Sequence, residues 1–305
     1  MSKEREWPDL PPARWRDTYG TLHMWTQIVG KTRLALAPPE NHSWQVALYL
    51  TPRGLTTSPM PSGDRTVAVE FDFISHRLLI QTSAGTERSL PLAPVSVADF
   101  FAQYERALRD LGIDARIYAT PVEVETAIPF AQDRRHAAYD PDIAHRCWKI
   151  LASTQRVMQS YRGRFTGKQS PAHFFWGSFD LAATRFSGRR APKHPGGAPH
   201  CPDRVMIEAY SHECASCGFW PGDGDSRPAA FYAYAYPEPL AYSTQRVEPE
   251  AAHYDHQARE FLLPYESLRT SPTPDDALLS FFETTYEAAA DLGRWDRASL
   301  DRLDA

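Results

Sequence analysis

The chain has few cysteines and no long apolar segment. Its 305 residues include only four cysteines, too few for a disulfide framework in a chain of this length, which favours a reducing compartment. The amino-terminal residues form no apolar signal segment, and no run approaches the roughly 20 apolar residues that a membrane-spanning helix needs. We therefore expect a soluble, cytoplasmic protein that does not interact with membranes.

The sequence also lacks a large charge excess of either sign. The formal net charge is −5, the isoelectric point is about 6.1, and the basic residues are scattered along the chain. Proteins that bind nucleic acids normally concentrate positive charge on one surface. We therefore expect no nucleic-acid partner, and nothing in the sequence determines the oligomeric state.

Familiar catalytic motifs are missing or incomplete. Gly30-Lys31-Thr32 resembles the end of a phosphate-binding loop, but Trp25 stands where that loop needs a glycine. The segment 214–220 resembles the nucleophile segment of papain-like proteases, but Ala215 replaces the first glycine and too few residues follow it. The chain has no G-x-S-x-G, G-x-G-x-x-G or H-E-x-x-H motif. Motifs alone therefore identify no reaction.

The order of helical and strand patterns predicts an α+β fold with mainly antiparallel sheets. A helix opens at Pro11-Pro12 and keeps helical spacing of apolar residues to about Leu36, and Gly112 closes a second helix. A third helix begins near Asp140. The strands expected in the first half are residues 45–51, 66–73 and 77–82.

The two halves of the chain repeat this order of elements. Residues 99–112 and 280–293 align without a gap and share a Phe-Phe pair and a closing Asp-Leu-Gly, and Gly-Lys follows a long helix at both 30–31 and 167–168. The repetition favours an internal duplication, with halves 1–130 and 131–305, a pocket between them and the candidate site in the second half. Chance similarity of amphipathic helices within an ordinary α+β fold is the alternative.

Seven phrases spread along the chain resemble those of one protein family. They are, in order, TLHMWTQIVGK, RGLTTSPMP, HFFWGSFDLAATRFSGR, EAYSHE, GFWPG, AFYAYAYPEP and TYEAAADLG. In this respect the chain is similar, over nearly its whole length, to a family of bacterial proteins of unknown function. The resemblance implies no activity, cofactor or catalytic residue, so the chemistry must be argued from the residues.

The aromatic segment 168–185 carries the first candidates for a site. It contains His173, Asp180 and Arg185, and ionisable groups among apolar ones are costly to bury unless they are paired or ligated. Read as one strand, it places His173 and Arg185 on one face and Trp176 and Asp180 on the other. The alternatives are a core histidine bonded to a carbonyl group, and structural ion pairs for Asp180 and Arg185.

A second predicted strand, residues 211–220, supplies further candidates. His212 and Cys214 share one face, whereas Cys214 and Cys217 point to opposite faces and are expected to be buried, reduced thiols. His173 and His212 are predicted as catalytic residues together with Asp180. They are also predicted as ligands of iron or zinc, with Glu213 as the carboxylate ligand.

Aromatic residues predict a ligand pocket. Tyr232, Tyr234 and Tyr236 lie on one face of a third predicted strand and form a row of rings and hydroxyl groups. Trp176 and Arg185 are further expected ligand contacts, and His23 is predicted to complete a polar lining from the first helix. The competing histidine groups are the loop 193–201, which could be a mobile surface loop, and residues 252–256, which could be an exposed turn.

From these features we expect the protein to be an enzyme that acts on a small organic molecule, either with or without a metal ion. Ionisable groups that converge in a concavity would favour an enzyme, whereas aromatic walls with few such groups would favour a ligand-binding or sensor protein. Fold class cannot decide between the two. The substrate and the reaction do not follow from the sequence.

Overall fold

The structure is a computed structural model and describes residues 6–302. Its helices are α1 (Pro12–Leu36), α2 (Val97–Asp110), α3 (Pro141–Gly163), α4 (Asp203–Ala209), α5 (Tyr265–Arg269), α6 (Pro274–Leu292) and α7 (Arg297–Leu300). Three short 3-10 helices are η1 (Asn41–Val46), η2 (Phe130–Gln132) and η3 (Tyr242–Thr244). The helices and two antiparallel six-stranded sheets confirm the predicted α+β class.

The first sheet belongs to the first half of the chain. Its strands are β1 (Tyr49–Leu50), β2 (Gly54–Thr56), β3 (Met60–Ser62), β4 (Arg65–Asp72), β5 (Arg77–Thr82) and β6 (Glu87–Pro91), in the order β1-β2-β4-β5-β6 with β3 also on β4. Alternation along β4, which lies within the predicted strand 66–73, buries Val67, Val69 and Phe71 on one face. The hydroxyl of Ser96 caps α2 by accepting a hydrogen bond from the backbone N–H of Asp99.

The second sheet belongs to the second half. Its strands are β7 (His173–Phe175), β8 (Asp180–Arg190), β9 (His212–Trp220), β10 (Ala230–Tyr236), β11 (His253–Asp255) and β12 (Glu260–Pro264), in the order β11-β12-β10-β9-β8-β7. Its central strands β8, β9 and β10 are the long ones. The predicted strands at 211–220 and around the tyrosine row are therefore confirmed as β9 and β10.

The two sheets meet at their inner edges. Leu48 and Phe174 form an antiparallel bridge in which each backbone N–H donates to the carbonyl of the other residue at 2.9 Å. Each half thus begins with a long helix, continues with antiparallel strands and ends with a helix. The strand order agrees from the inner edge outward, but β11 lies outside β12 in the second sheet, whereas the first sheet ends on β6. The duplication itself stays a prediction.

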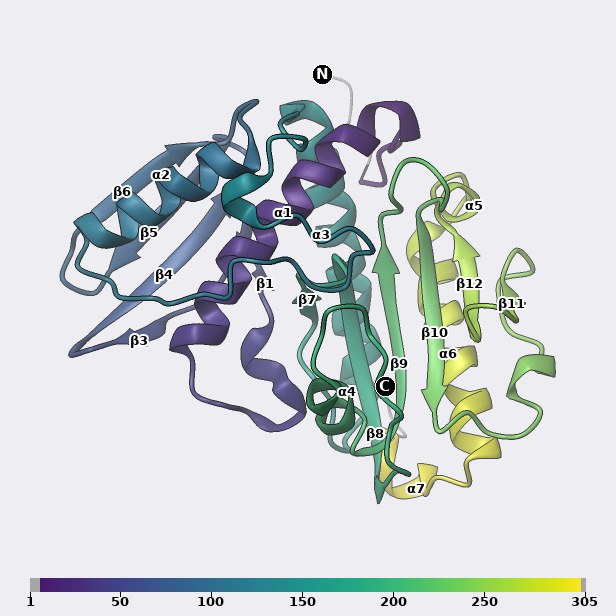
Figure 1. Cartoon of the computed structure of the whole chain (residues 1–305). Helices are drawn as coiled ribbons and strands as arrows, with labels where there is room; N and C mark the ends of the chain where they lie inside the picture. Colours follow the sequence, from purple (N-terminus) through teal and green to yellow (C-terminus); the bar gives the residue numbers. More distant parts are fainter. Residues whose placement is uncertain (1–5, 303–305) are drawn as a thin grey trace.

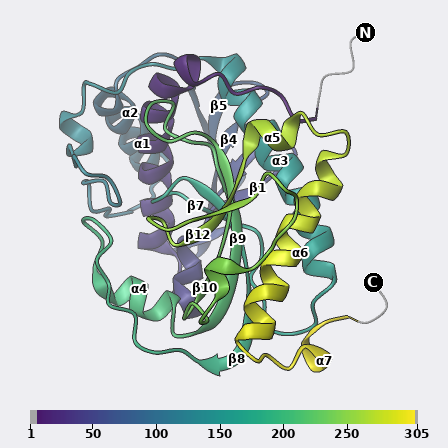
Figure 2. The same ribbon diagram turned by 90° about the vertical axis from the view of Figure 1, so that its right-hand side faces the viewer.

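Helices cover the two sheets from different sides. In Figure 1, α2 and α1 lie against the first sheet, with α1 and α3 between the two lobes. Figure 2 shows α3 and α6 on one side of the second sheet and α1 and α4 toward its other side. The face of the second sheet that α3 and α6 leave uncovered is the one that forms the candidate site.

Residues 173–190 form a hairpin rather than the expected single strand. β7 pairs with β8 through His173–Ala182 and Phe175–Asp180, and Phe179 in the intervening turn has a positive φ of 62°. His173 therefore lies on the same sheet face as Ala182 and Asp180, opposite to Arg185. The expectation that His173 and Arg185 share a face was wrong because the turn reverses the chain.

Residues 41–46 also depart from the expected strand 45–51. They form η1, in which His42 and Ser43 have positive φ values of 60° and 58°, and only Tyr49–Leu50 remain as a strand. The ring of His42 contacts the backbone carbonyl of Ala209, at the end of α4, with Nδ1 at 2.9 Å from the oxygen. This long-range hydrogen bond holds a conformation that local sequence preferences do not favour.

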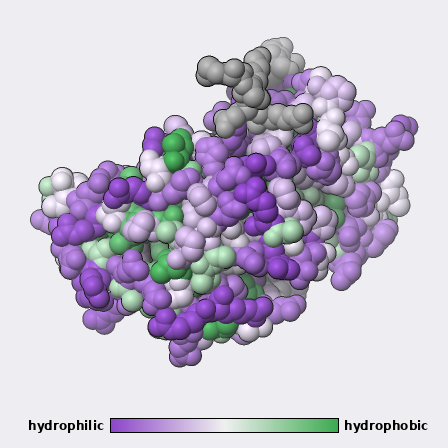
Figure 3. Space-filling model, turned by 90° about the horizontal axis from the view of Figure 1, so that it is seen from above, coloured by the Kyte–Doolittle hydropathy of each residue, from purple (hydrophilic) through white to green (hydrophobic). Residues whose placement is uncertain are grey.

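The surface agrees with the mean hydropathy of −0.48. The face in Figure 3 is mostly hydrophilic, with short apolar patches between the polar groups. Among residues 6–302, no helix combines the length and the apolar character needed to cross a membrane.

Candidate functional site

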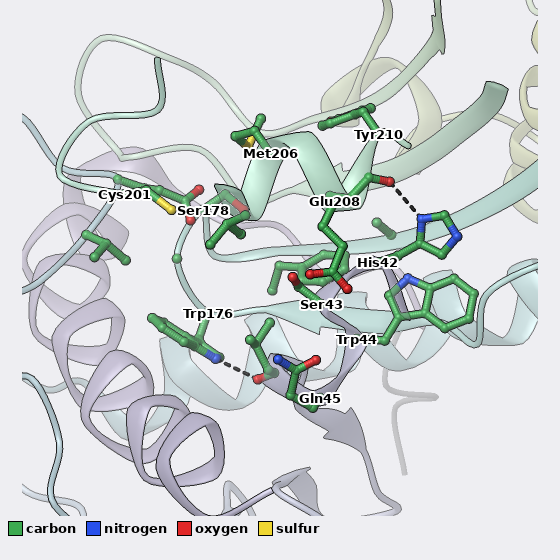
Figure 4. Close-up of a pocket in the computed structure, with 18 of the residues that line it drawn as sticks. His42, Ser43, Trp44, Gln45, Trp176, Ser178, Cys201, Met206, Glu208 and Tyr210 are labelled. Atoms are coloured by element: carbon green, nitrogen blue, oxygen red, sulfur yellow. Dashed lines mark hydrogen bonds between the residues drawn. The ribbon is translucent and has the colours of Figure 1, made fainter. Parts of the chain in front are cut away.

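A cavity of about 1030 Å³ lies on the uncovered face of the second sheet. The strands β8, β9 and β10 form its floor, and η1, α4, the end of α1 and the connector after α2 form its walls. In Figure 4, Met206 and Glu208 of α4 face Trp176, Trp44 and Gln45 across the space, with Cys201 at one side. A volume of this size can enclose a small organic molecule.

Small, aromatic and hydroxyl-bearing side chains alternate across the floor of the cavity. Strand pairing sets Thr184 beside Ser216, with their hydroxyl oxygens 3.0 Å apart, and Ser216 beside Tyr234. The hydroxyl of Tyr234 also meets that of Tyr210, at 2.7 Å. The floor thus offers several hydroxyl groups that are held in fixed positions.

Asp180 is the acidic group of this floor. It lies at the start of β8, is 7% exposed, and accepts hydrogen bonds from the hydroxyl groups of Ser178 and Tyr232. The Tyr232 ring passes over Gly218 of the intervening strand, where a Cβ atom would overlap the ring. Burial raises the pKa of Asp180, and the two hydrogen bonds oppose this shift.

Glu123 reaches the same cavity from the connector between α2 and α3. Its backbone has a positive φ of 57°, and its N–H donates to the carbonyl of Pro199 at 2.8 Å. The amide side chain of Gln27 in α1 bonds both backbone groups of the preceding residue, Val122. The Glu123 carboxylate approaches Gly177 so closely that a Cβ atom there would overlap it. Non-glycine residues in this conformation are concentrated at functional sites.

The ionisation of Glu123 is shifted toward neutral pH. Desolvation by the surrounding cavity walls, together with the Asp180 carboxylate, raises its pKa to about 7, and Lys31 opposes the shift. The side chain is nevertheless accessible to solvent within the open cavity, and water there screens part of the effect. A carboxyl group of this kind can both donate and accept protons near pH 7.

Lys31 of α1 lies in the cavity wall near Glu123. The residue is 4% exposed, and its Nζ atom lies 5.3 Å from the ring centre of Tyr118 and 5.6 Å from that of Trp176. The Trp176 indole N–H donates to the carbonyl of Val46 at 2.7 Å, which fixes the ring (Figure 4). Burial lowers the pKa of Lys31 to about 8.

Three basic side chains, His42, Lys168 and His212, lie together beside η1, and of these His42 lines the cavity. The carbonyl of Ala209 can only accept, so Nδ1 of His42 carries the proton and Nε2 accepts from Lys168 at 2.8 Å. The His212 ring lies 5.5 Å from that of His42. Burial lowers the pKa of His42, and the neighbouring Lys168 and His212 lower it further. His42 is therefore a neutral ring that positions Lys168.

The structure places the predicted residue His173 in an aromatic enclosure rather than in the cavity lining. It is 1% exposed, its ring lies 5.4–5.5 Å from those of Trp44, Tyr49 and Phe175, and neither ring nitrogen has a hydrogen-bond partner among the described residues. Burial, with Arg33 nearby, lowers its pKa to about 3. The expected carbonyl partner of a core histidine is thus not found in residues 6–302.

The two residues predicted to join His173 in a metal site lie elsewhere. Nδ1 of His212 contacts the hydroxyl of Ser211 at 3.1 Å, and Glu213 accepts from Ser187 and forms an ion pair with Arg189. Within the described part of the chain, no group of three or more His, Cys, Asp or Glu side chains could hold a metal ion. The structure therefore does not bring the three predicted iron or zinc ligands together.

Of the predicted ligand contacts, Trp176, Tyr232 and Tyr234 line the cavity, as does the predicted catalytic residue Asp180. Tyr236 lies at the end of the tyrosine row, where its hydroxyl donates to the carbonyl of Pro192.

His23 and Arg185 serve other contacts. The Nε2 atom of buried His23 lies 2.8 Å from the carbonyl oxygen of Gly177 and supports the turn beneath Glu123, and burial lowers its pKa to about 4. Arg185 lies on the covered face, where its guanidinium donates to Glu283 of α6 and to the carbonyl of Tyr161 of α3.

The cysteines follow the strand alternation. Cys214 lines the cavity, whereas Cys217 lies on the covered face with its Sγ atom 3.7 Å from the carbonyl oxygen of Ala183. Both are buried and free, and burial raises the pKa of Cys214 to about 12. The prediction of two buried thiols on opposite faces is confirmed.

Sequence reasoning missed the residues that come from outside the strands. Lys31 stands out in the sequence only within two Gly-Lys patterns, an incomplete phosphate-binding loop and a possible internal repeat, and Glu123 lies in a connector without a periodic pattern. Of the competing histidine loop 193–201, His200 and Cys201 line the cavity. The glycine that precedes Lys31 is the one local sequence signal for this part of the cavity wall. Gly30 lies inside a helix, and the Trp176 ring packs where its Cβ atom would be.

Comparison with protein-family models finds a match over nearly the whole chain. A model of a family of unknown function, DUF5996, matches residues 7–302. The chain belongs to this family. Its match spans both sheets and every residue of the cavity, which agrees with the resemblance seen in the sequence. No curated protein and no solved structure gives a significant match.

Proposed function

We propose that the protein is an enzyme that acts on a small organic molecule by acid–base chemistry in the cavity described above. Three ionisable side chains from separate segments support this proposal: Lys31 from α1, Glu123 from a connector and Asp180 from β8. Glu123 would transfer protons, and the fixed pair of Asp180 and Tyr232 would orient a polar group of the substrate. The convergence of ionisable groups in a concavity carries the proposal.

The chemistry proposed here requires no metal ion. A site of this type can work through a carboxyl group whose pKa lies near the working pH and through hydroxyl groups that are already positioned. The aromatic walls formed by Trp44, Trp176 and Tyr234 favour a molecule with apolar as well as polar parts. These walls also suit the second candidate function, a ligand-binding or sensor protein that performs no reaction.

A substrate screen separates the two candidates. The protein is incubated with a defined mixture of small organic acids, amines, carbonyl compounds and alcohols, and their consumption is followed by mass spectrometry. We expect the wild-type protein to consume at least one compound and Glu123→Gln to do so about 100-fold more slowly, because the amide cannot transfer the proton. Glu125→Gln changes an exposed carboxylate two residues away and serves as the matched control.

The outcomes of this screen differ for each function. A compound that raises the melting temperature of the protein but is never consumed would indicate a binding or sensor protein. Consumption at equal rates by the wild type and Glu123→Gln would contradict the proposed role of Glu123. An unchanged melting temperature of Glu123→Gln without ligand would show that the variant is folded.

A further inference from the structure

The amine of Lys31 is unusual because no acid within residues 6–302 is directly hydrogen-bonded or ion-paired to it. Among residues 6–302, Nζ makes no hydrogen bond or ion pair, and its neighbours are the rings of Tyr118 and Trp176. Most lysines either extend into solvent or pair with a carboxylate when they are buried. An amine that is buried at the edge of a cavity and has no carboxylate bonded to it is poorly solvated and can react as a neutral nucleophile.

The local packing fixes the position of this amine. Gly30 precedes Lys31 and leaves room for the Trp176 ring, which a Cβ atom at residue 30 would displace. Trp176 is in turn held by the carbonyl of Val46 at 2.7 Å. The Lys31 side chain is buried where it leaves α1, and it lines the cavity. The surrounding packing therefore directs the amine toward the cavity.

An acid lies near the amine. Glu123 and Lys31 both line the cavity and influence each other electrostatically, and the Asp180 carboxylate, which also lines it, acts electrostatically on Glu123. With a pKa of about 8 instead of 10.5, about 300 times more of the Lys31 amine is unprotonated at pH 7. A neutral amine beside a proton donor is the combination needed to add to a carbonyl group and then expel water.

We propose that Lys31 forms an imine with an aldehyde or ketone bound in the cavity, a proposal that rests on the function proposed above and names its substrate class. The Nζ lone pair attacks the carbonyl carbon, and one of the two Nζ protons passes to the carbonyl oxygen, which gives a neutral carbinolamine. Glu123 then protonates the hydroxyl group, which leaves as water while the nitrogen lone pair forms the C=N bond. The nitrogen proton returns to solvent or to the Glu123 carboxylate.

Reductive trapping tests this proposal on the full chain. The protein is treated with benzaldehyde and cyanoborohydride at pH 7, so that hydride addition to the imine carbon leaves a stable benzylamine, and the labelled peptides are mapped by mass spectrometry. The chain has only five lysines, Lys3, Lys31, Lys149, Lys168 and Lys193. We expect Lys31 to be labelled at least about tenfold faster than each of the others.

Variants define the outcome. Lys31→Arg should lose the fast labelling, Glu123→Gln should slow it at least about tenfold, and Lys193→Arg, which changes an exposed lysine, should leave it unchanged.

Equal labelling of all lysines, or fast labelling that persists in Lys31→Arg, would overturn the imine proposal. Benzaldehyde that stabilises the protein without labelling Lys31 would also overturn it, yet would leave acid–base catalysis on a non-covalently bound substrate standing. Fast labelling of Lys31 in a protein that consumes no compound would instead contradict the proposed enzyme.

Discussion

The two faces of the second sheet each bury a charged side chain from the same strand, β8, but in different surroundings. Arg185 on the covered face meets the carboxylate of Glu283 and stacks on Tyr161, with its guanidinium carbon 3.5 Å from the ring centre. Asp180 on the open face meets only hydroxyl donors and borders a cavity. The covered face therefore uses its charge for packing, whereas the open face keeps a carboxyl group whose burial is not balanced by a cation.

The largest expected loss of stability comes from removing the buried charge on the covered face. Arg185→Met should lower the free energy of unfolding by about 3–5 kcal/mol, because it leaves Glu283 without its buried partner. Asp180→Asn on the open face should lower the free energy of unfolding by less than about 2 kcal/mol. The hydroxyl groups of Ser178 and Tyr232, which donate to Asp180, can turn toward the cavity instead. Both values are measurable by urea denaturation.

The double variant Arg185→Met/Glu283→Gln provides the control. It should recover part of the lost stability, because the unpaired carboxylate is removed together with its partner. A cost for Asp180→Asn equal to that of Arg185→Met would show that both faces are structural and would weaken the assignment of the open face as a functional site.

His173 tests whether burial on the open side of the sheet is by itself a sign of function. Its folded-state pKa of about 3 lies below 6.5, so its neutral form stabilises the fold fully above pH 6.5. That contribution should fall by about 1.4 kcal/mol for each pH unit between 6.5 and 3, because the unfolded chain takes up the proton first. The charges that act on the ring are those of Arg33 of α1 and Arg162 of α3, and both disfavour protonation.

His173→Phe should therefore flatten the dependence of stability on pH below 6.5. It removes two ring nitrogens that lack partners and keeps the ring contacts, so its stability at pH 7 should equal or exceed that of the wild type. Denaturation at pH 5 and pH 7 measures the difference. A variant that is clearly less stable at pH 7 would indicate a partner for the imidazole, such as a bound water molecule or ligand.

The last comparison concerns two glycines in helices, one inside α1 and one at the end of α3. Gly30→Ala should destabilise the protein by about 1–3 kcal/mol, because the added Cβ atom overlaps the Trp176 ring in the cavity wall. Gly163→Ala, the matched control at the end of α3, meets nothing within 4 Å and should stabilise by about 0.5 kcal/mol. Thermal unfolding of both variants measures these shifts. Equal effects at the two positions would contradict a tightly packed cavity wall.

Local patterns predicted the regular parts of this fold well. The helix spacing that starts at Pro12 and the alternation of Tyr232 with its neighbours both have a period set by the backbone itself. The prediction was wrong where the chain turns unexpectedly, as at Phe179, since a left-handed residue without glycine gives no clear sequence signal. His173 was accordingly assigned to the wrong face.

The sequence by itself determined the α+β class, the tyrosine row on one face of β10, and the opposite orientations of Cys214 and Cys217. These features depend on the 3.6-residue and two-residue periods, which act within one element. Only the tertiary structure decided that Lys31 and Glu123 reach one cavity with Asp180. Their positions depend on contacts between segments far apart in the chain, such as the bonds from Gln27 to Val122, and no local period records such contacts.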